Sequence, residues 1–450
     1  MTIDSTWLHS FKAETREAFT KKAPFRHNAV FTDGQIRLMQ GGGPQARLQT
    51  WDEYIRRQFL SPLTRFLDTC DTVVLAFDCY DHVPPAKCMT QLKRRRHIPP
   101  TDFGEHSCLP PSVPHGEAWA GAISNRSFKA KVIELVLLSL PGWLLKDRPE
   151  KRLVVDYTAP IAMHWDAERR LVVRQEIDGL PPLGEADVKF TRYADLYQRL
   201  MVDSIDGDSV PIALLHHERC LAVETTPPRV CIYRLELKER EPAPPKQDKR
   251  SGAGKRKSPD PPEKRDARPK RTYEYVDVQC LYEALRTAVL QSIGRTHLPL
   301  HAGHEIRMLI ALVCLTGTDF SRGLPQISGR TVYDLLPRIW MTLVLTYDPA
   351  LDLLRPEDGA DRLVALLYHE KFPKHAPSRR GLRGVLAELG ASAISQRTKD
   401  TLPSHERIEA TVRNVNWVLQ YWRCGDCPDP VDPAFGYRRT QQGLTQYADA

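Results

Sequence analysis

Two acidic residues lie at positions where a carboxylate could bind a metal ion. Asp33 and Asp78 each follow a short apolar stretch, residues 29–32 and residues 73–77, and each stretch predicts a buried strand. The carboxyl ends of parallel strands open into the ligand crevice of an α/β sheet. Carboxylate oxygens in such a crevice can hold a hard divalent cation. The two strand ends therefore predict a metal site.

Five further acids lie at helix starts and turns. Glu185 and Asp187 suit the first turn of a helix that runs to about residue 201, although the helix dipole favours acids there in any case. Asp206 and Asp208 are two residues apart, so in an extended chain both would project to one side; a solvated Asp-Gly-Asp turn is the alternative. Asp319 lies in a Gly-flanked turn before residues that predict turn and helix.

Basic residues follow the strand that ends at Asp78. Pro84 and Pro85 interrupt the chain, and the segment from Ala86 can restart as a helix. That helix would carry Lys87, Lys93, Arg94, Arg95 and Arg96. Lys and Arg side chains bind phosphate oxygens, so an acid facing this helix suits a metal and a phosphodiester. The alternative is a core strand, an Asp that caps a turn and a solvated basic helix.

The net charge does not by itself indicate nucleic-acid binding. Of the formal charge of +8, residues 238–271 carry +7, with 13 Lys or Arg against 6 Asp or Glu. This stretch contains seven Pro and no aromatic residue, which predicts a disordered insertion. Lys249-Arg250 and Lys255-Arg256-Lys257 resemble a two-part nuclear import signal, with a solubilising linker as the alternative.

The cysteines and the apolar pattern bear on location. The 10 Cys are scattered along 450 residues, which favours a reducing compartment. The N-terminus has no apolar leader, and no window approaches 18 uncharged apolar residues, so we expect neither export nor a membrane span. A nuclear, monomeric protein without membrane association is the expectation.

The order of the acids resembles the flap endonuclease and xeroderma pigmentosum G-type family of 5′ nucleases. FDCYDHVPPAK is similar to the family's F-D-G-x-x-P-P-x-x-K stretch, and GEAD is similar to its S-E-A-E. SIDGDSVPIAL resembles its strand with a D-x-D pair. LTGTDFSRGLPQISGRT resembles L-x-G-x-D-Y followed by G-I-P-G-I-G-P-K-T. The resemblance covers roughly residues 1–235 and 273–345.

The resemblance implies an α/β, PIN-like fold. We expect a central, mostly parallel sheet flanked by helices, a helix-two-turn-helix-like segment and a helical C-terminal region. Residues 1–237 would form the first part of the nuclease core, with 86–140 as an arch or gateway-like helical region. Residues 238–272 would be the disordered basic insertion, 273–345 the rest of the core, and 346–450 the helical C-terminal region and tail.

By the same resemblance, the activity would be Mg²⁺-dependent hydrolysis of DNA phosphodiesters near junctions of single and double strand. Two Mg²⁺ ions, or Mn²⁺ in their place, would be held as in other two-metal nucleases. One would be held by Asp78, Glu185 and Asp187, with Asp33 acting through water, and the other by Asp206, Asp208 and Asp319. An RNA-cleaving member and an inactive scaffold that binds nucleic acid or protein are the alternatives.

The resemblance also implies which basic and polar residues contact the substrate. Lys87 and Arg94 match the family's catalytic lysine and arginine and would stabilise charge on the scissile phosphate. The residues expected to bind nucleic acid are Lys93, Arg95, Arg96, Arg330 and Thr331.

The chain departs from the family pattern at several glycines. Thr2 and Ser5 stand where the family's N-terminal glycines would be, and Gln326 and Ser328 replace two glycines of the hairpin that binds duplex backbone and a monovalent cation. A side chain at such a position hinders close approach of a phosphate to the backbone. Duplex anchoring is therefore expected to be altered.

The C-terminal tail carries one partner signal. Gln441, Leu444 and Tyr447 resemble the sliding-clamp binding box, but Ala448 stands in place of its second aromatic residue. A plain disordered tail is the alternative.

Overall fold

The computed structural model describes most of the chain. The described residues are 6–11, 13–40, 48–79, 103–104, 106–180, 183–236, 272–294, 303–318, 323–324, 327–351, 353–355, 363–364, 366–367, 405–424, 437–440 and 443–446. The predicted basic helix after Ala86, the charged insertion with its import-like signal, Asp319 and Gln326 lie outside them. Predictions for those residues remain predictions.

A nine-stranded sheet forms the centre of the molecule, in the order β1-β9-β8-β7-β2-β3-β4-β5-β6. The five inner strands, β8, β7, β2, β3 and β4, run parallel, and antiparallel pairs extend the sheet at both edges. The strands are β1 (Phe19–Thr20), β2 (Ala29–Asp33), β3 (Thr72–Ala76), β4 (Arg152–Asp156), β5 (Pro160–Asp166), β6 (Leu171–Glu176), β7 (Arg199–Asp203), β8 (Arg229–Glu236) and β9 (Thr272–Asp277).

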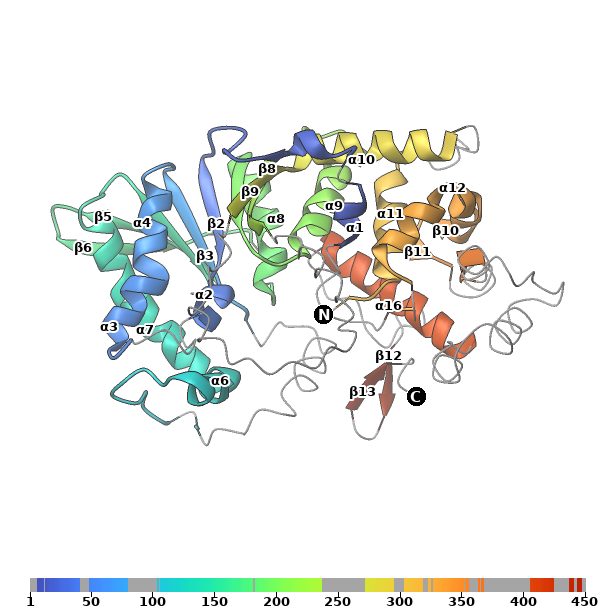
Figure 1. The fold of residues 1–450 in the computed structure, drawn as a ribbon. Coiled ribbons are helices and arrows are strands. Elements are labelled where there is room, and N and C mark those ends of the chain that lie inside the picture. The colour runs from blue at the N-terminus through green and yellow to red at the C-terminus, as the bar shows by residue number, and fades with distance from the viewer. Residues whose placement is uncertain are drawn as a thin grey trace, which may run out of the picture.

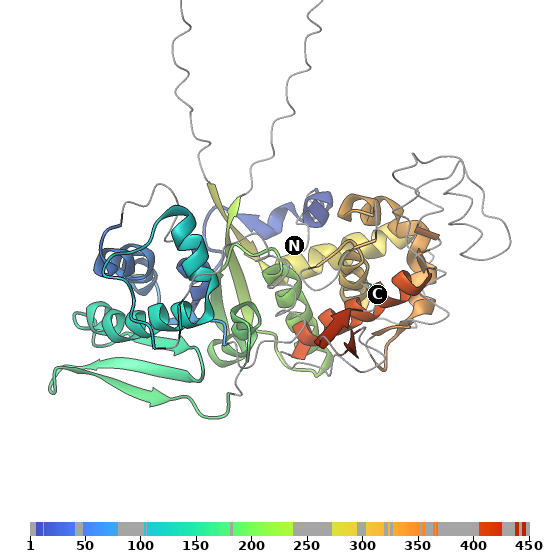
Figure 2. The ribbon, with the colours of Figure 1, turned by 90° about the horizontal axis from the view of Figure 1, so that it is seen from below.

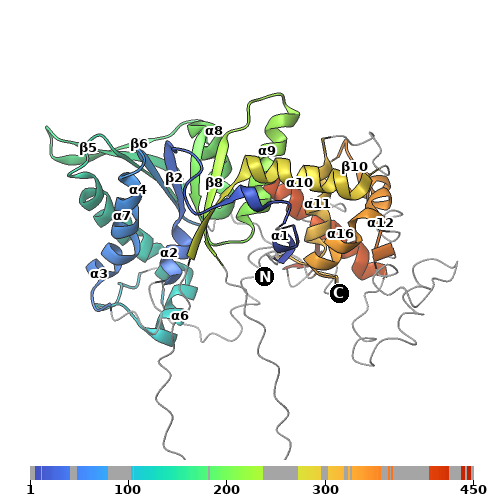
Figure 3. The same cartoon turned by 45° about the horizontal axis from the view of Figure 1, so that its top comes forward.

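Helices cover both faces of this sheet (Figure 1). On one face lie α2 (Gly34–Gln40), α3 (Trp51–Ile55), the π-helical turn η2 (Arg56–Leu60), α4 (Ser61–Leu67), α6 (Gly116–Ser124) and α7 (Arg126–Leu145). On the other lie α8 (Ala186–Tyr197), α9 (Ser209–Ala222), α10 (Val278–Ile293), α11 (Glu305–Cys314), α12 (Gly329–Thr346) and α16 (His405–Cys424). Figure 3 shows the two groups on opposite sides of the strands.

Alternation along the inner strands builds two hydrophobic cores. In β2, Phe31 packs with the α8–α16 group and Val30 with the α3–α7 group. In β3, Val74 and Leu75 divide in the same way. Both faces are buried because successive strand residues project to opposite sides and each side is covered by helices. The predicted α/β class with a mostly parallel, helix-flanked sheet is confirmed.

Short elements complete the described structure. Near the N-terminus are α1 (Thr6–Ser10) and the 3-10 turn η1 (Arg16–Ala18). Two small hairpins, β10 (Tyr347–Asp348) with β11 (Leu353–Leu354) and β12 (Tyr437–Thr440) with β13 (Gly443–Gln446), lie in the C-terminal third. Among the helices in the described part of the chain, none combines the length and apolar character that a membrane crossing requires.

Several predicted elements differ from those observed. The amphipathic pattern of residues 1–28 predicts a helix, but α1 ends at Ser10, and after η1 the chain forms the short edge strand β1. The helix predicted to reach about residue 201 ends at Tyr197, because Gln198 adopts a left-handed conformation (φ 59°). Residues 199–203 instead pair with β2 and β8 as strand β7. The strand β5 was not predicted; with β6 it forms a hairpin that extends from the body of the molecule (Figure 2).

Candidate metal-binding carboxylate site

The connection order of the parallel strands places a topological switch point between β2 and β7. The chain builds β2, β3 and β4 outward in one direction and then returns to place β7 and β8 on the other side of β2. In open α/β sheets, ligands bind at the carboxyl ends of the strands where the direction of winding reverses. Asp33 ends β2, and Asp206 and Asp208 follow β7, so three predicted site residues flank this switch point.

Asp33 is held by the start of the next helix. Its Oδ1 accepts hydrogen bonds from the backbone N–H groups of Gln35 (2.8 Å) and Ile36 (3.3 Å) at the first turn of α2. The side chain is buried, with 6% of the residue exposed. Gly34 allows the strand to turn into α2 here, because a Cβ at this position would lie 2.6 Å from the Phe77 ring and 2.7 Å from the Ala76 carbonyl oxygen.

Asp78 meets the N-terminus of α8. Its Oδ1 accepts a hydrogen bond from the Ala186 N–H at 3.0 Å, and the next residue, Cys79, donates its N–H to the Gly184 carbonyl at 2.7 Å. Glu185 is buried at the position that precedes α8, and Asp187 lies in its first turn. The positive end of the helix therefore faces Asp78. The end of β3 and the start of α8, whose acids were predicted separately, therefore meet in the fold.

The Asp206 and Asp208 pair lies in a turn. Asp206 Oδ1 accepts a hydrogen bond from the Asp208 N–H at 3.1 Å, and Asp208 has a helical backbone at the start of α9 (φ −71°, ψ −21°). The extended arrangement considered from the sequence, with the pair carried on the strand, is wrong, because β7 ends at Asp203. The pair lies in a turn, but the turn is not the solvated one of the alternative, because Asp208 is buried.

Two other carboxylates act electrostatically on Asp33. Burial raises the pKa of Asp33 from 3.8 to about 7, and the charges of Asp78 and Asp206 raise that pKa as well, against the two backbone hydrogen bonds that lower it. Asp208 acts likewise on Cys314, whose pKa is raised mainly by burial and further by that carboxylate. A buried acid whose ionisation is opposed by neighbouring acids is a ligand type that fits divalent cations.

Two further acids also end strands, but they form ion pairs within the protein. Asp156 ends β4 and is 1% exposed, yet it is paired with Lys189 (Oδ1 to Nζ, 3.0 Å) and with Arg192. Asp203 ends β7 and pairs with Arg37 of α2. Internal ion pairs thus neutralise both carboxylates, which leaves them no role as ligands.

Lys189 connects the sheet to the helix that carries Glu185 and Asp187. Its Nζ is fully buried and donates to the carbonyl oxygens of Phe77 (2.8 Å), Tyr157 (3.1 Å) and Asp156 (3.2 Å). Phe77 directly precedes Asp78, so this ammonium fixes the end of β3 against α8. The sequence analysis did not identify Lys189, because nothing in its local pattern shows that it points into the sheet.

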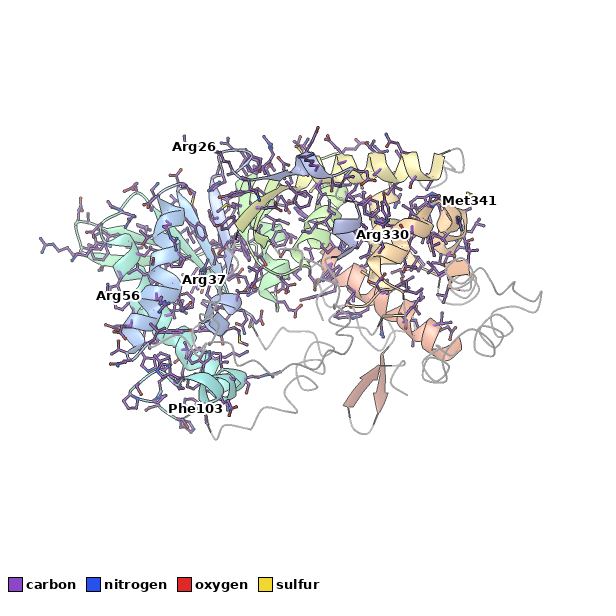
Figure 4. The ribbon with its side chains drawn as sticks, in the orientation of Figure 1. Arg26, Arg37, Arg56, Phe103, Arg330 and Met341 are labelled. Carbon is purple, nitrogen blue, oxygen red and sulfur yellow. The ribbon has the colours of Figure 1, made fainter. Side chains whose placement is uncertain are left out.

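Arg330 and Thr331, expected to bind nucleic acid, lie at the start of α12. Arg330 pairs with Asp334 one turn later (Nε to Oδ1, 2.9 Å), and the Thr331 N–H is capped by the Ser328 hydroxyl (3.3 Å). Figure 4 places Arg330 among the helices on one side of the sheet and Arg37 near α2. Ser328 therefore caps a helix where the family pattern has glycine. Leu444 of the predicted clamp box lies in β13, opposite Arg439, whereas Gln441 and Tyr447 lie outside the described residues.

A second polar cluster joins the far ends of α8 and α9. Asp195, His216 and Cys220 place one potential ligand atom each within 4.8 Å of one another. His216 Nε2 lies 3.0 Å from Asp195 Oδ1, while Nδ1 lies 3.0 Å from the Arg219 guanidinium. Because the guanidinium can only donate, Nδ1 accepts and Nε2 carries the proton. A metal on Nε2 would force that proton to face Arg219, so we interpret the cluster as a hydrogen-bonded link between the helices.

Comparisons with known proteins give distant likenesses to solved structures. No protein-family model matches the chain, and no curated protein matches it. Among solved structures, the catalytic core of Rad2 in complex with DNA substrate is similar over 93% of this chain and 95% of that chain, with 11% sequence identity and a TM-score of 0.39. A likeness at that level carries no conclusion about activity, which has to follow from the chain's own residues.

Proposed function

We propose that the chain is a metal-dependent nuclease that hydrolyses DNA phosphodiesters near junctions of single and double strand. The observation that carries the proposal is the gathering of acids at the switch point of the sheet, where Asp33 is buried at the end of β2 and the charges of Asp78 and Asp206 act on it. These acids offer oxygen ligands, which suit Mg²⁺ or Mn²⁺ rather than zinc. The preference for DNA junctions rests on the resemblance of the acid pattern to the 5′ nucleases.

The chain's own residues would divide the work as follows. Asp78, oriented by the Ala186 N–H, would hold one cation with Glu185 and Asp187. Asp206 and Asp208, presented by the turn before α9, would hold the second, and the proposal adds Asp319 to this set. Asp33 would orient a water ligand. Bound cations of this kind activate a water and stabilise the leaving oxygen in phosphodiester hydrolysis.

The phosphate contacts are part of the same proposal. Lys87 and Arg94 would lie against the scissile phosphate, where a fixed positive charge stabilises the charge that develops during displacement. Neighbouring basic residues of the same segment, Lys93, Arg95 and Arg96, would hold the flanking backbone. These contacts would be lost at raised ionic strength, since phosphate binding is dominated by counterion release.

The test is cleavage of end-labelled 5′-flap, nicked, bubble and single-stranded DNA, with a matched RNA flap, in Mg²⁺ and in EDTA. Asp187→Asn and Asp195→Asn form a matched pair on α8, since the first alters the site and the second lies near the far end of the helix. We expect Asp187→Asn to lower the cleavage rate by more than roughly 100-fold. A residue that only hydrogen-bonds to a metal ligand typically changes activity by less than that. Asp195→Asn should retain the parent rate.

Two results would overturn the proposal. The first is an absence of cleavage in Mg²⁺ and Mn²⁺ while DNA binding persists, which would indicate a binding scaffold. The second is equal loss of activity in both variants, which would show that the effect comes from α8 as a whole and not from a ligand. Preferential cutting of the RNA flap would show that the substrate is RNA and not DNA.

A further inference from the structure

The hairpin of β5 and β6 leaves one margin of the nine-stranded sheet open. β6 is the last strand of the sheet, and within the described residues β5 is its only neighbouring strand. The hairpin extends from the body of the molecule in Figure 2. No proline lies in β6, and the two strands pair residue by residue without a bulge. Proline and bulges are common features that prevent an edge strand from pairing with another chain, and β6 lacks both.

The backbone hydrogen bonds of the hairpin show which groups of β6 face outward. Ile177 donates its N–H to the Pro160 carbonyl at 3.0 Å, one step beyond the last residue pair of the ladder. Opposite residues in an antiparallel ladder alternate between hydrogen-bonded pairs and pairs whose N–H and C=O groups point away. The odd-numbered residues of β6 therefore bond to β5. The N–H and C=O groups of Val172, Arg174 and Glu176 point to the open edge, where a further strand can pair with them.

The side chains of this outward-facing row carry charges of opposite sign. Arg174 and Glu176 are both exposed, and they project to one face because alternate strand residues share a face. Helix α7 covers this face, and the Arg174 guanidinium donates to the Leu137 carbonyl of that helix at 3.3 Å. Two charges of the same sign would repel a second copy of the strand. A basic and an acidic residue two positions apart can instead match the same pair on a copy that runs in the opposite direction.

We propose that β6 pairs with β6 of a second copy of this chain, so that the two sheets join across a two-fold axis. With the axis at Gln175, the antiparallel strands place Arg174 opposite Glu176 of the partner subunit, and the symmetry forms the same pair a second time. Both residues belong to the outward-facing row, so they also exchange backbone hydrogen bonds. Charge and hydrogen-bond pattern thus select the same register. The dimer differs from the monomer expected from the sequence, and it would form whether or not the chain cuts nucleic acid.

Apolar side chains near the edge would be covered by the same contact. On the other face of the strand, this register places the half-buried Val173 opposite Ile177 of the partner subunit. The two-fold axis is perpendicular to the joined sheet, so the α7 helices of both copies lie on one face. Leu138 of α7 follows Leu137 and is 74% exposed. Burial of apolar surface would stabilise the dimer, while the backbone pairing fixes its orientation.

The experiment is sedimentation equilibrium of the full chain over a range of protein concentrations. It compares the parent, Arg174→Glu, Glu176→Arg and an equimolar mixture of these two variants. In either variant alone, like charges would lie opposite each other at both symmetry-related positions. In the mixture, two acidic side chains of one copy would meet two basic side chains of the other. Lys131→Glu is the matched control, because it reverses an exposed charge of α7 that pairs within the helix with Glu134 (3.1 Å).

We expect the parent and Lys131→Glu to dimerise equally, and each edge variant to dimerise roughly tenfold more weakly, because two attractive pairs become repulsive. The mixture should dimerise as strongly as the parent. Thermal unfolding shows whether each variant is folded.

Three results would overturn the proposal: a monomeric parent, a dimer that neither edge variant weakens, and a mixture that stays monomeric. Hydrogen exchange distinguishes the causes of a monomeric parent. Slow exchange of the Val172, Arg174 and Glu176 amides in the monomer would show that another segment of the chain pairs with β6. Fast exchange would show that the two charges keep the edge in contact with water.

Discussion

The ionisation of Asp33 makes the metal-free protein's stability depend on pH in a predictable direction. Replacing this residue in Asp33→Asn removes the charge and keeps an oxygen that can accept from the Gln35 and Ile36 N–H groups, so the capping of α2 is preserved. The variant therefore isolates the cost of ionising a carboxyl in this buried, acid-lined position.

The magnitude follows from the pKa. In the folded protein the pKa of Asp33 is about 7, against an ordinary value of 3.8, first through burial and then through Asp78. At about 1.4 kcal/mol per pKa unit, full ionisation costs the folded state about 4 kcal/mol. Because the unfolded chain releases its proton first, the wild type loses this stability as pH rises from about 4 to about 7. Asp33→Asn avoids the loss.

The assay is urea denaturation in EDTA, followed by tryptophan fluorescence, at pH 5 and pH 8. Relative to the wild type, Asp33→Asn should gain about 3 kcal/mol in free energy of unfolding between the two pH values. Asp52→Asn, an exposed acid in the first turn of α3, serves as the control and should show no such gain. Added Mg²⁺ should stabilise the wild type at pH 8 more than the variant, because binding to the folded state adds to stability.

A particular result would refute this reasoning. If the stability difference between Asp33→Asn and the wild type were the same at pH 5 and pH 8, Asp33 would not be held in a charge-opposing environment. A variant less stable than the wild type at pH 8 in EDTA would show that the carboxylate is stabilised by a partner cation of the protein itself. The metal proposal would then lose its electrostatic basis.

Two further predictions concern the residues that hold the acids in place. Lys189→Met should lower the free energy of unfolding by about 3 kcal/mol or more, because it leaves Asp156 and three carbonyl groups without the ammonium. Calorimetric melting measures this change, and a loss below about 1 kcal/mol would contradict the anchoring role of Lys189. Gly34→Ala should lower the free energy of unfolding by about 1–3 kcal/mol, because the added Cβ would lie 2.6 Å from the Phe77 ring. It should also weaken Mn²⁺ binding by moving Asp33 away from Asp78. A Mn²⁺ affinity equal to the parent's would show that metal binding does not depend on the close approach of β2 to β3 at this point.

The confirmed parts of the fold are those that local sequence determines. Residues 29–33 form the strand predicted from their apolar, β-branched pattern, because such a pattern fits a strand covered on both faces. Apolar spacing likewise predicts helices over residues 51–67 and 126–140, where the structure has α3, η2 and α4, and α7, respectively. Glu185 and Asp187 lie at a helix start as expected. In each case the information is contained within one or two turns of chain.

What only the tertiary structure decided is which acids gather and what neutralises them. Asp33 and Asp156 each end an apolar strand, and nothing local separates them. In the fold, Asp33 meets other acids, whereas Asp156 meets Lys189 and Arg192. Residues 199–203 became a strand only because β2 and β8 lie on either side to pair with them.

The surroundings of Tyr421 also could not be predicted from the sequence, because they involve residues far away along the chain. Its helix has an ordinary buried face, and its own neighbours in sequence do not indicate its electrostatic surroundings. Burial raises its pKa, and the charge of Glu185 raises that pKa further, because α16 packs on α9 in the fold. Electrostatic and hydrogen-bonding environments are properties of residues distant in sequence. The sequence alone therefore determined the strands and the candidate acids, and long-range packing determined which of them share a site.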